Sequence, residues 1–425
     1  AFTFTPAPGG AVMHYQLPAN GDIMGLYVYY KDVYGKDIVR SGSTAADSLM
    51  ITGFNEAQNA VPAEVRLMRR DRSQSEPITV TFSTGDSDPV VFMNSLEVLS
   101  DWGGFTITYD SIRPGAEGLF HVFYLGTDPL TGLPDTLLIS TQTLTQAALY
   151  DKQLFTIKQD VTHPVVVVSC EDLRGNRVDV RVFDNVECMY PEQLGSDKFD
   201  FYCSRSLIDD NLKLGPQYLF DGDKIGHEAL AYNFENNTHY YFSFVAGPDC
   251  VGEKAEPMYI DLKRNRVFKS IKVYDQMGTQ YNSNLYSFET GGYDVQGEWG
   301  MLPMAITIYG ARDDGDKTKI KEKDMSAFEW KELSHGERAF TPANCYPTDY
   351  ETYPTSPADA LNKEETFLEI NTPAVGQGDG YRYLKIVVNS VFAPYYDTFS
   401  AWFGYANTKN YVTFHEMEIF TKIDN

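Results

Sequence analysis

The stretch that decides the fold of the C-terminal half is Ile271-Lys-Val-Tyr274, in which apolar Ile and Val alternate with Lys and Tyr. One buried face of an antiparallel sheet requires such a period of two. The series therefore predicts an antiparallel β-sandwich. Six further pieces of this half read as part of the same series: Leu219–Asp223, Tyr259–Leu262, Ile306–Gly310, Trp330–Leu333, Tyr381–Ile386 and His415–Phe420.

The length and composition of the chain extend this prediction to an all-β protein of three domains. A chain of 425 residues exceeds one ordinary core, and about 150 residues per domain suggests roughly three. Aromatic residues make up 14% of the chain, which suits pleated strands, while 33 Gly and 21 Pro supply turns.

An internal repeat divides the first 190 residues into two copies. Gly9–Tyr15 recurs as Gly103–Tyr109, and Gly25–Tyr30 recurs as Gly118–Tyr124 at nearly the same spacing. The second copy is slightly longer, and we expect its insertion near Thr127–Pro134, where Pro and Gly punctuate a loop. Each copy has about the length of a seven-stranded sandwich.

Both copies resemble fibronectin type III domains in the Gly-Gly strand, the aromatic strand after it and the strand that ends, in the first copy, at Asp71–Pro77. We place the fibronectin type III-like domains at residues 1–86 and 87–190. The last domain, residues 191–425, resembles the discoidin-like jelly roll, also known as the coagulation-factor type C or galactose-binding fold.

This order of domains resembles the surface glycan-binding lipoproteins of polysaccharide-utilisation loci in Bacteroidetes. The resemblance implies a non-catalytic protein, lipid-anchored at the outer-membrane cell surface, whose C-terminal domain binds oligo- or polysaccharide. It also implies outer-membrane glycan importer components as possible partners, and we expect a monomer. The chain begins at Ala1 rather than Met, which fits a mature chain whose export signal lay upstream.

Charge argues against nucleic acid as a partner. The formal net charge is −24, which phosphate backbones and anionic lipid headgroups repel. No apolar stretch of the sequence is long enough to cross a bilayer as a helix.

The five cysteines are Cys170, Cys188, Cys203, Cys250 and Cys345. Their odd number and the lack of any C-x-x-C pair fit neither a zinc site nor a disulfide scaffold. Cys170, inside an apolar run, is expected to pack as a small apolar side chain. A disulfide between two of the others remains open.

The resemblance also implies a structural Ca²⁺, held by an Asp-Gly-Asp turn, a nearby Thr and a Glu in the last strand. Asp221, Asp223 and Glu416 match that pattern, but Gly226 stands where the Thr would be. Three carboxylates with backbone carbonyls could supply the oxygens that calcium needs. The alternative is that Asp221-Gly-Asp223 is only a turn and Glu416 an exposed strand residue.

Candidate ligand contacts are aromatic rings in loops, because a sugar offers an apolar C–H face to a flat ring. Tyr293 and Trp299 lie in a Gly-rich loop, Trp402 and Tyr405 in a second aromatic cluster, and Tyr232 follows the Asp-Gly-Asp turn. For the two Trp residues, burial in the core is the alternative.

Two other features are assigned structural roles. Trp330, in Trp330–Leu333, resembles a core tryptophan of the fold, and Asp313–Asp324 is typical of a solvated hairpin loop. The chain lacks a Gly-x-Ser-x-Gly elbow, a His-Glu-x-x-His helix and a phosphate-binding loop, so we predict no enzyme activity. A protein-docking module of the transport complex and, with less support, a glycoside hydrolase or lyase remain alternatives.

Overall fold

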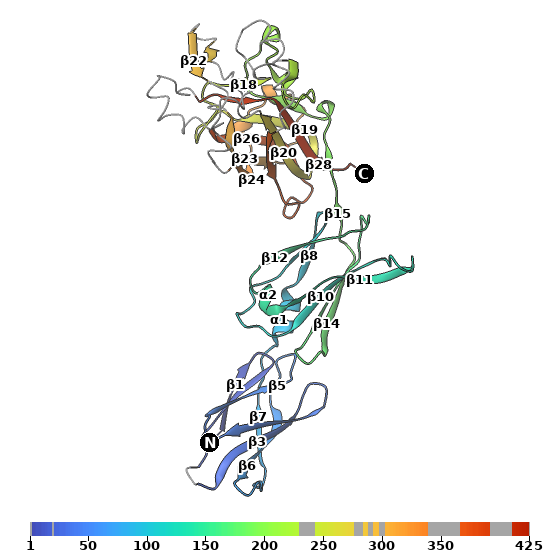
Figure 1. The fold of residues 1–425 in the computed structure, drawn as a ribbon, viewed down its shortest axis with the longest axis vertical. Helices are drawn as coiled ribbons and strands as arrows, with labels where there is room; N and C mark the ends of the chain where they lie inside the picture. Colours follow the sequence, from blue (N-terminus) through green and yellow to red (C-terminus); the bar gives the residue numbers. More distant parts are fainter. Residues whose placement is uncertain are drawn as a thin grey trace, which may run out of the picture. The chain divides into compact units, whose positions relative to one another are not determined.

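A computed structural model describes residues 2–18, 21–228, 243–275, 284–287, 292–296, 302–338, 366–391 and 410–424. The chain divides into two compact units, residues 1–189 and 190–425 (Figure 1). Almost all regular structure in the described ranges is β-strand, so the all-β prediction is confirmed. None of the described helices is long and apolar enough to span a membrane.

The first sandwich of unit 1 has seven strands in two sheets, ordered β1-β2-β5 and β4-β3-β6-β7. Alternation sets its core, since Leu26, Val28 and Tyr30 of β3 are buried while Tyr27 and Tyr29 between them are only half-buried. The strands are β1 (Phe2–Ala7), β2 (Gly10–Tyr15), β3 (Ile23–Lys31), β4 (Asp37–Ser43), β5 (Ser48–Thr52), β6 (Val61–Arg69) and β7 (Ile78–Phe82).

The second sandwich of unit 1 repeats this plan, with sheets β12-β9-β8-β15 and β11-β10-β13-β14. Two short helices, which the sequence analysis did not predict, are added to it. Its elements are α1 (Asp88–Ser95), β8 (Glu97–Trp102), β9 (Gly104–Thr108), β10 (Leu119–Thr127), β11 (Pro134–Thr143), α2 (Leu144–Ala147), β12 (Lys152–Thr156), β13 (Val166–Glu171), β14 (Arg177–Phe183) and β15 (Cys188–Met189).

The repeated Gly-Gly pair has the same structural reason in both sandwiches. Gly9 and Gly103 adopt φ values of +62° and +64°, which side chains rarely tolerate. A Cβ on Gly10 or Gly104 would collide with a carbonyl oxygen of the neighbouring strand. The two copies therefore start their second strand by the same turn and close approach.

Unit 2 is a jelly-roll sandwich of a four-stranded sheet, β16-β28-β20-β25, and a five-stranded sheet, β17-β19-β26-β23-β24. Two further strand pairs are β18–β27 and β21–β22. Apolar residues of both sheets, including Ile271, Val273, Ile306 and Ile386, form one buried cluster between them. Of the pieces predicted from alternation, Leu219–Asp223 is not a strand, because it forms a turn after a 3₁₀ helix.

The strands of unit 2 are β16 (Pro191–Gln193), β17 (Asp200–Tyr202), β18 (Phe244–Ala246), β19 (Met258–Arg266), β20 (Phe268–Asp275), β21 (Asn284–Ser287), β22 (Gly292–Gln296), β23 (Pro303–Ala311), β24 (Lys331–Glu337), β25 (Thr366–Asn371), β26 (Tyr381–Val391), β27 (Val412–Phe414) and β28 (Glu416–Lys422). Its described 3₁₀ helices are η1 (Ser196–Lys198), η2 (Asp210–Leu212), η3 (Pro216–Tyr218), η5 (Ile320–Glu322) and η6 (Met325–Ala327).

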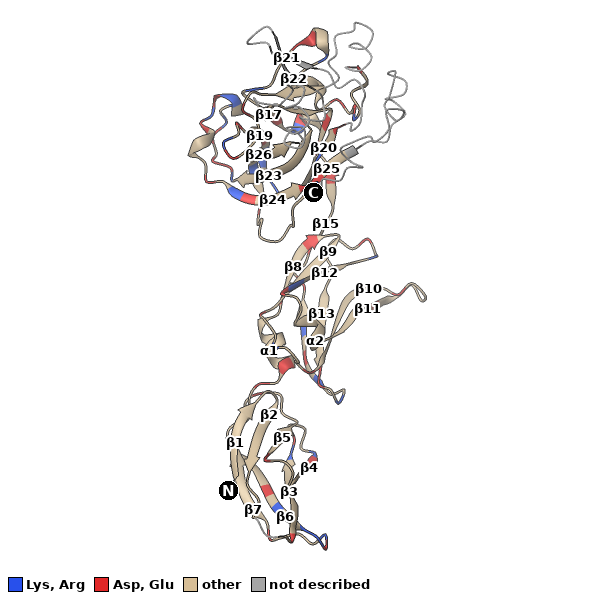
Figure 2. Cartoon of the chain, turned by 60° about the vertical axis from the view of Figure 1, so that its left-hand side comes forward, with Lys and Arg blue, Asp and Glu red and all other residues tan. Residues whose placement is uncertain are grey.

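The sandwich of unit 2 has two ends, which differ in the strands that begin or finish there. At one end Glu416 pairs with Tyr274 in register, and Arg338 forms an ion pair with Asp275; we call this the Glu416 end. The opposite end, where β23 finishes and β24 and β26 begin, is called the Trp330 end. Figure 2 shows acidic and basic residues interspersed along the described parts of the chain.

Candidate functional site

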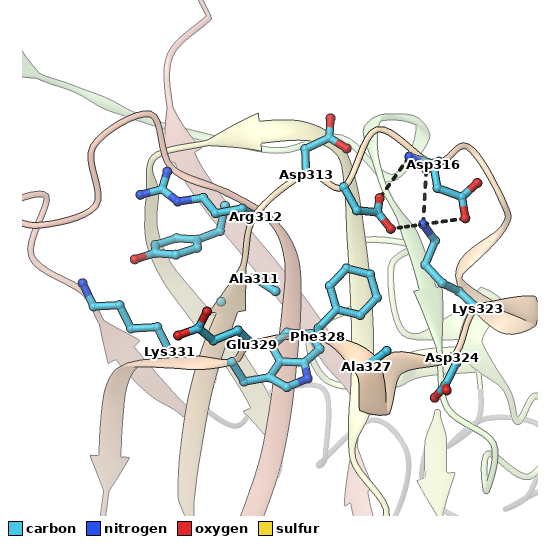
Figure 3. Close-up of a pocket in the computed structure, with 14 residues that line it drawn as sticks. Ala311, Arg312, Asp313, Asp316, Lys323, Asp324, Ala327, Phe328, Glu329 and Lys331 are labelled. Carbon is cyan, nitrogen blue, oxygen red and sulfur yellow. Dashed lines mark hydrogen bonds and ion pairs between the residues drawn. The ribbon is translucent and has the colours of Figure 1, made fainter.

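A hollow of about 860 Å³ opens at the Trp330 end of unit 2 (Figure 3). It lies between the end of β23, the connection to β24 and the start of β26, and we call it the Trp330 pocket. Its lining residues are Gly310, Ala311, Arg312, Asp313, Asp314, Asp316, Lys323, Asp324, Ala327, Phe328, Glu329, Trp330, Lys331 and Tyr381.

Trp330 is held as a fixed aromatic wall of this pocket. Its indole Nε1 donates a hydrogen bond of 3.0 Å to the carbonyl oxygen of Met325. The ring centroid lies 5.9 Å from that of Tyr259 and 6.0 Å from that of Phe328, and the Lys385 ammonium lies 5.1 Å from the ring centroid. The half-buried ring thus packs on a small cluster beneath it and also faces the hollow.

Arg312 and Tyr381 make a second fixed surface. The guanidinium lies 4.7 Å from the centroid of the buried Tyr381 ring. It also donates to the carbonyl oxygens of Gln377, at 2.6 Å, and Gly380. These partners fix the guanidinium at the pocket edge. Binding of a ligand would therefore cost this side chain little further conformational entropy.

The acidic side of the pocket is fastened by a buried arginine. Arg382 donates two hydrogen bonds, of 2.9 and 3.0 Å, to the carboxylate of buried Asp261. The same guanidinium reaches Asp313 at 2.7 Å and the carbonyl oxygen of Asp316 at 2.9 Å. The loop after β23 is therefore tied to the core of the sheet, whereas the composition of Asp313–Asp324 predicted a solvated hairpin loop.

Lys323 completes this side by bridging two carboxylates of the loop. Its Nζ lies 2.8 Å from Asp314 and 3.2 Å from Asp316. Hydrogen bonds from Thr318 and then Lys323 lower the pKa of Asp316 to about 2. The Arg382 hydrogen bond is the main cause that lowers the pKa of Asp313, and these side chains are ionised at neutral pH.

The four aspartates of the Trp330 pocket do not have the pKa that a glycosidase's general acid needs. A glycosidase needs a carboxylic acid that keeps its proton near neutral pH. The pKa values of Asp313, Asp314, Asp316 and Asp324 are all lowered, so these four groups do not meet that need. Flat rings beside fixed hydrogen-bonding groups are what a sugar ring requires.

A pair of carboxyl groups lies at the Glu416 end. Asp221 and Glu416 lie near one another, and an oxygen of Glu416 accepts the backbone N–H of Gly222 at 3.1 Å. Burial, together with the neighbouring charge of Asp221, raises the pKa of Glu416 to about 8. Burial also raises the pKa of Asp221.

The predicted metal ligands converge only in part. Asp223 accepts hydrogen bonds from His227 at 2.6 Å and from the backbone N–H of Glu228 at 3.2 Å, within its own turn. Within the described residues, no group of three His, Cys, Asp or Glu has an arrangement that could hold a metal. Asp221 and Glu416 are neighbouring carboxyl groups, which could supply oxygen ligands to a cation, so Ca²⁺ here stays a proposal.

The departure at Gly226 has a steric reason. This residue has φ +67°, and a Cβ added to it would lie 2.5 Å from Nδ1 of His415 and 3.1 Å from Oγ of Ser243. A Thr at this position would therefore require the buried His415 side chain to move and would adopt an unfavourable φ.

The five predicted ligand contacts lie outside the described side chains. The backbone of Tyr293 belongs to β22, but its side chain is not described. The others are Tyr232, Trp299, Trp402 and Tyr405. Sequence reasoning missed the residues of the Trp330 pocket, although Phe328 and Trp330, alternating directly after a charged loop, were a usable signal.

Comparison with known proteins adds the following. Residues 1–84 match the family model of a domain of unknown function (DUF4959), and no curated protein matches the chain. A solved SusE-like protein is 14% identical, covers 79% of this chain and 100% of its own, and has a TM-score of 0.42.

Two further solved structures represent the separate modules. An F5/8 type C domain from Bacteroides fragilis is 14% identical over 55% of this chain and 97% of its own, with a TM-score of 0.26. A two-domain fibronectin type III segment of chicken tenascin is 13% identical over 43% of this chain and 95% of its own, with a TM-score of 0.19. These are the kinds of protein that the sequence resembles, and the sheet orders described above establish the sandwiches themselves.

Proposed function

We propose that this protein binds uncharged oligo- or polysaccharide without transforming it, and that the Trp330 pocket is one binding site. The observation that carries this proposal is the half-buried Trp330 ring, fixed by its hydrogen bond to Met325 and turned to a hollow edged by Arg312 and Glu329. A saccharide can stack its C–H face on this ring while its hydroxyls meet the polar edge.

Charge supports an uncharged ligand. The pocket carries five carboxylates against three basic groups, and each basic group already has protein acceptors. A uronic acid or sulfated sugar would meet Asp324 and Glu329, both of them exposed, rather than a free cation. We therefore expect neutral glycans to bind and acidic glycans to be rejected.

The test is affinity electrophoresis and calorimetry of the full chain with a panel of neutral and acidic polysaccharides. Because Trp330 also packs against the core, Trp330→Ala is accompanied by Glu329→Ala, which removes an exposed pocket group without a packing role. We expect each to weaken binding of a neutral glycan by about 1–3 kcal/mol. Matched controls are Glu332→Ala, outside the pocket, and Tyr150→Ala, an exposed aromatic of unit 1.

Absence of binding to every glycan of the panel would refute the proposal. Equal binding by Glu329→Ala, Trp330→Ala and the parent chain would show that the Trp330 pocket is not the binding site. The next candidates would then be the contacts predicted from the sequence, Tyr232, Tyr293, Trp299, Trp402 and Tyr405. Release of reducing ends from any polysaccharide would instead favour a hydrolase or lyase.

Location and partners belong to the same proposal. The order of modules supports a lipid-anchored protein at the outer-membrane surface, acting beside a glycan importer. Protease accessibility on intact cells, with and without removal of the anchor, tests the location.

Protein docking is a second candidate function, favoured by an apolar band on the second sandwich. Leu138, Phe123, Val167 and Val182 lie side by side across all four strands of one sheet. Leu138 is 57% and Val182 63% exposed. Exposed apolar patches of this kind commonly mark interaction sites. Loss of importer co-purification in Val182→Lys, but not in Val39→Lys on the other sandwich, would favour this function.

A further inference from the structure

Two cysteines far apart in sequence are brought together at one edge of unit 2. Ser206 forms an antiparallel bridge with Ala246, and the N–H of Gly247 donates to the carbonyl oxygen of Arg205 at 3.0 Å. Because the two segments are antiparallel, Cys203 lies before Ser206 on one of them and Cys250 lies after Ala246 on the other, on the same side of the bridge. The backbone therefore sets the two segments side by side.

The two cysteines are neighbours in the core of unit 2. Both residues are buried, at 5% and 1% exposure, and belong to the same apolar cluster. The Cys250 thiol donates a hydrogen bond of 3.8 Å to the carbonyl oxygen of Pro248. The nearby Cys250 thiol lowers the pKa of Cys203, which adds to the evidence from the backbone register that the two side chains are close.

The other described cysteines have no such neighbour. Cys170 lies in β13 and Cys188 in β15, which belong to different sheets of unit 1. Burial raises the pKa of both thiols, to about 11 for Cys188. Cys345 lies outside the described residues.

We propose that Cys203 and Cys250 form a disulfide when the protein meets an oxidising environment. In the step, the Cys203 thiolate attacks a small external disulfide such as oxidised glutathione, and one glutathione thiol leaves. The Cys250 sulfur, after losing its proton, then attacks Cys203 and displaces the second glutathione thiol. Two protons and two electrons leave the protein, and the external disulfide is reduced to two thiols.

This bond would close a covalent loop over residues 204–249. The loop contains the Asp221–Asp223 turn, so the crosslink restrains the segment that brings Asp221 to Glu416. A crosslink of this kind stabilises mainly by restricting the unfolded chain, more so when the closed loop is long. This inference stands apart from saccharide binding, because it rests only on the two thiols and their backbone.

The experiment is peptide mapping of the full chain after incubation with oxidised glutathione. Free thiols are blocked with iodoacetamide in denaturant, and trypsin is then added without reductant. Trypsin cuts after Lys198, Arg205, Lys224 and Lys254, so the expected product joins residues 199–205 to residues 225–254. Three cysteines should carry the label, and reduction should release the two peptides.

Two variants complete the test. Cys203→Ser and Cys250→Ser should each remove the joined peptides and leave four labelled cysteines. The melting temperature of the parent chain should fall by roughly 5–15 °C on reduction, while that of either variant should not respond. Five labelled cysteines in the oxidised parent chain, or a crosslink that includes Cys170, Cys188 or Cys345, would overturn the proposal.

Discussion

The substitution Glu416→Gln should stabilise the protein at pH 8 when calcium is absent. When calcium is present, the parent chain should be the more stable of the two. The pKa of Glu416 rises from 4.5 to about 8, because the carboxyl is buried and lies beside Asp221. In the unfolded chain the group ionises near its ordinary pKa. Between about pH 5 and pH 8 the folded protein therefore holds a proton that the unfolded chain has released.

The free energy of unfolding must then fall as pH rises through this window. Each pH unit costs about 1.4 kcal/mol, so the full shift corresponds to at most roughly 5 kcal/mol near pH 8. Because Asp221 and Glu416 titrate as a pair, the loss belongs to both groups together. Glutamine carries no charge, so Glu416→Gln should melt higher than the parent chain at pH 8 in EDTA, by up to roughly 10–15 °C.

Calcium should invert this order. A cation between the two carboxylates would replace that proton and stabilise the parent chain at pH 8, whereas Glu416→Gln has lost one anionic ligand. Thermal melts at pH 5, 6, 7 and 8, in EDTA and in millimolar CaCl₂, measure both effects, with Glu332→Gln as the exposed control.

Two results would contradict this reasoning. If the parent chain in EDTA melts at the same temperature at pH 5 and pH 8, the carboxyl pair does not hold the proton. If calcium raises the melting temperature of Glu416→Gln as much as that of the parent, the cation binds elsewhere.

Three further outcomes are expected. Arg382→Met should lower the free energy of unfolding in urea by roughly 3–5 kcal/mol, because it leaves buried Asp261 without its partner, whereas exposed Lys317→Met should change little. Burial raises the pKa of Asp32, but hydrogen bonds from backbone N–H groups and from Arg174 outweigh this effect and lower the pKa. The stabilisation that ionised Asp32 gives the fold is therefore present above about pH 4 and is lost as pH falls further. Asp32→Asn should therefore cost about 1–3 kcal/mol at pH 7 and make acid unfolding less steep, an effect that exposed Asp184→Asn should lack. Trp299→Ala and Trp402→Ala should weaken glycan binding by about 1–3 kcal/mol without changing the melting temperature; a large fall in melting temperature would instead assign that ring to the core.

The strands were predictable because their signal is local. Ile271–Tyr274 and Tyr381–Ile386 alternate within a few residues, and both lie inside observed strands, β20 and β26. The repeated Gly-Gly pair was visible as a repeat, although its cause, collision with a neighbouring strand, needs the fold. Helix α1 was missed because its helical stretch is only eight residues long.

The pocket could not be predicted, because its determinants are distant in sequence. Asp313 looks solvated until Arg382 is placed beneath it. Trp330 was assigned to the core, and one side of its ring does pack there, but no local pattern shows that the ring also faces a hollow. Nor could spacing alone pair Cys203 with Cys250, because only the register around Ser206 and Ala246 sets them side by side.

The position of β28 has a consequence for folding. This strand, residues 416–422, lies between β16 and β20, so the four-stranded sheet is incomplete until it is inserted. Its register places Phe420 opposite Gln193, so strands from the two ends of unit 2 meet in one sheet. Pairing segments so distant in sequence carries a large loop-closure entropy, and insertion of β28 should therefore be a late step in the folding of unit 2.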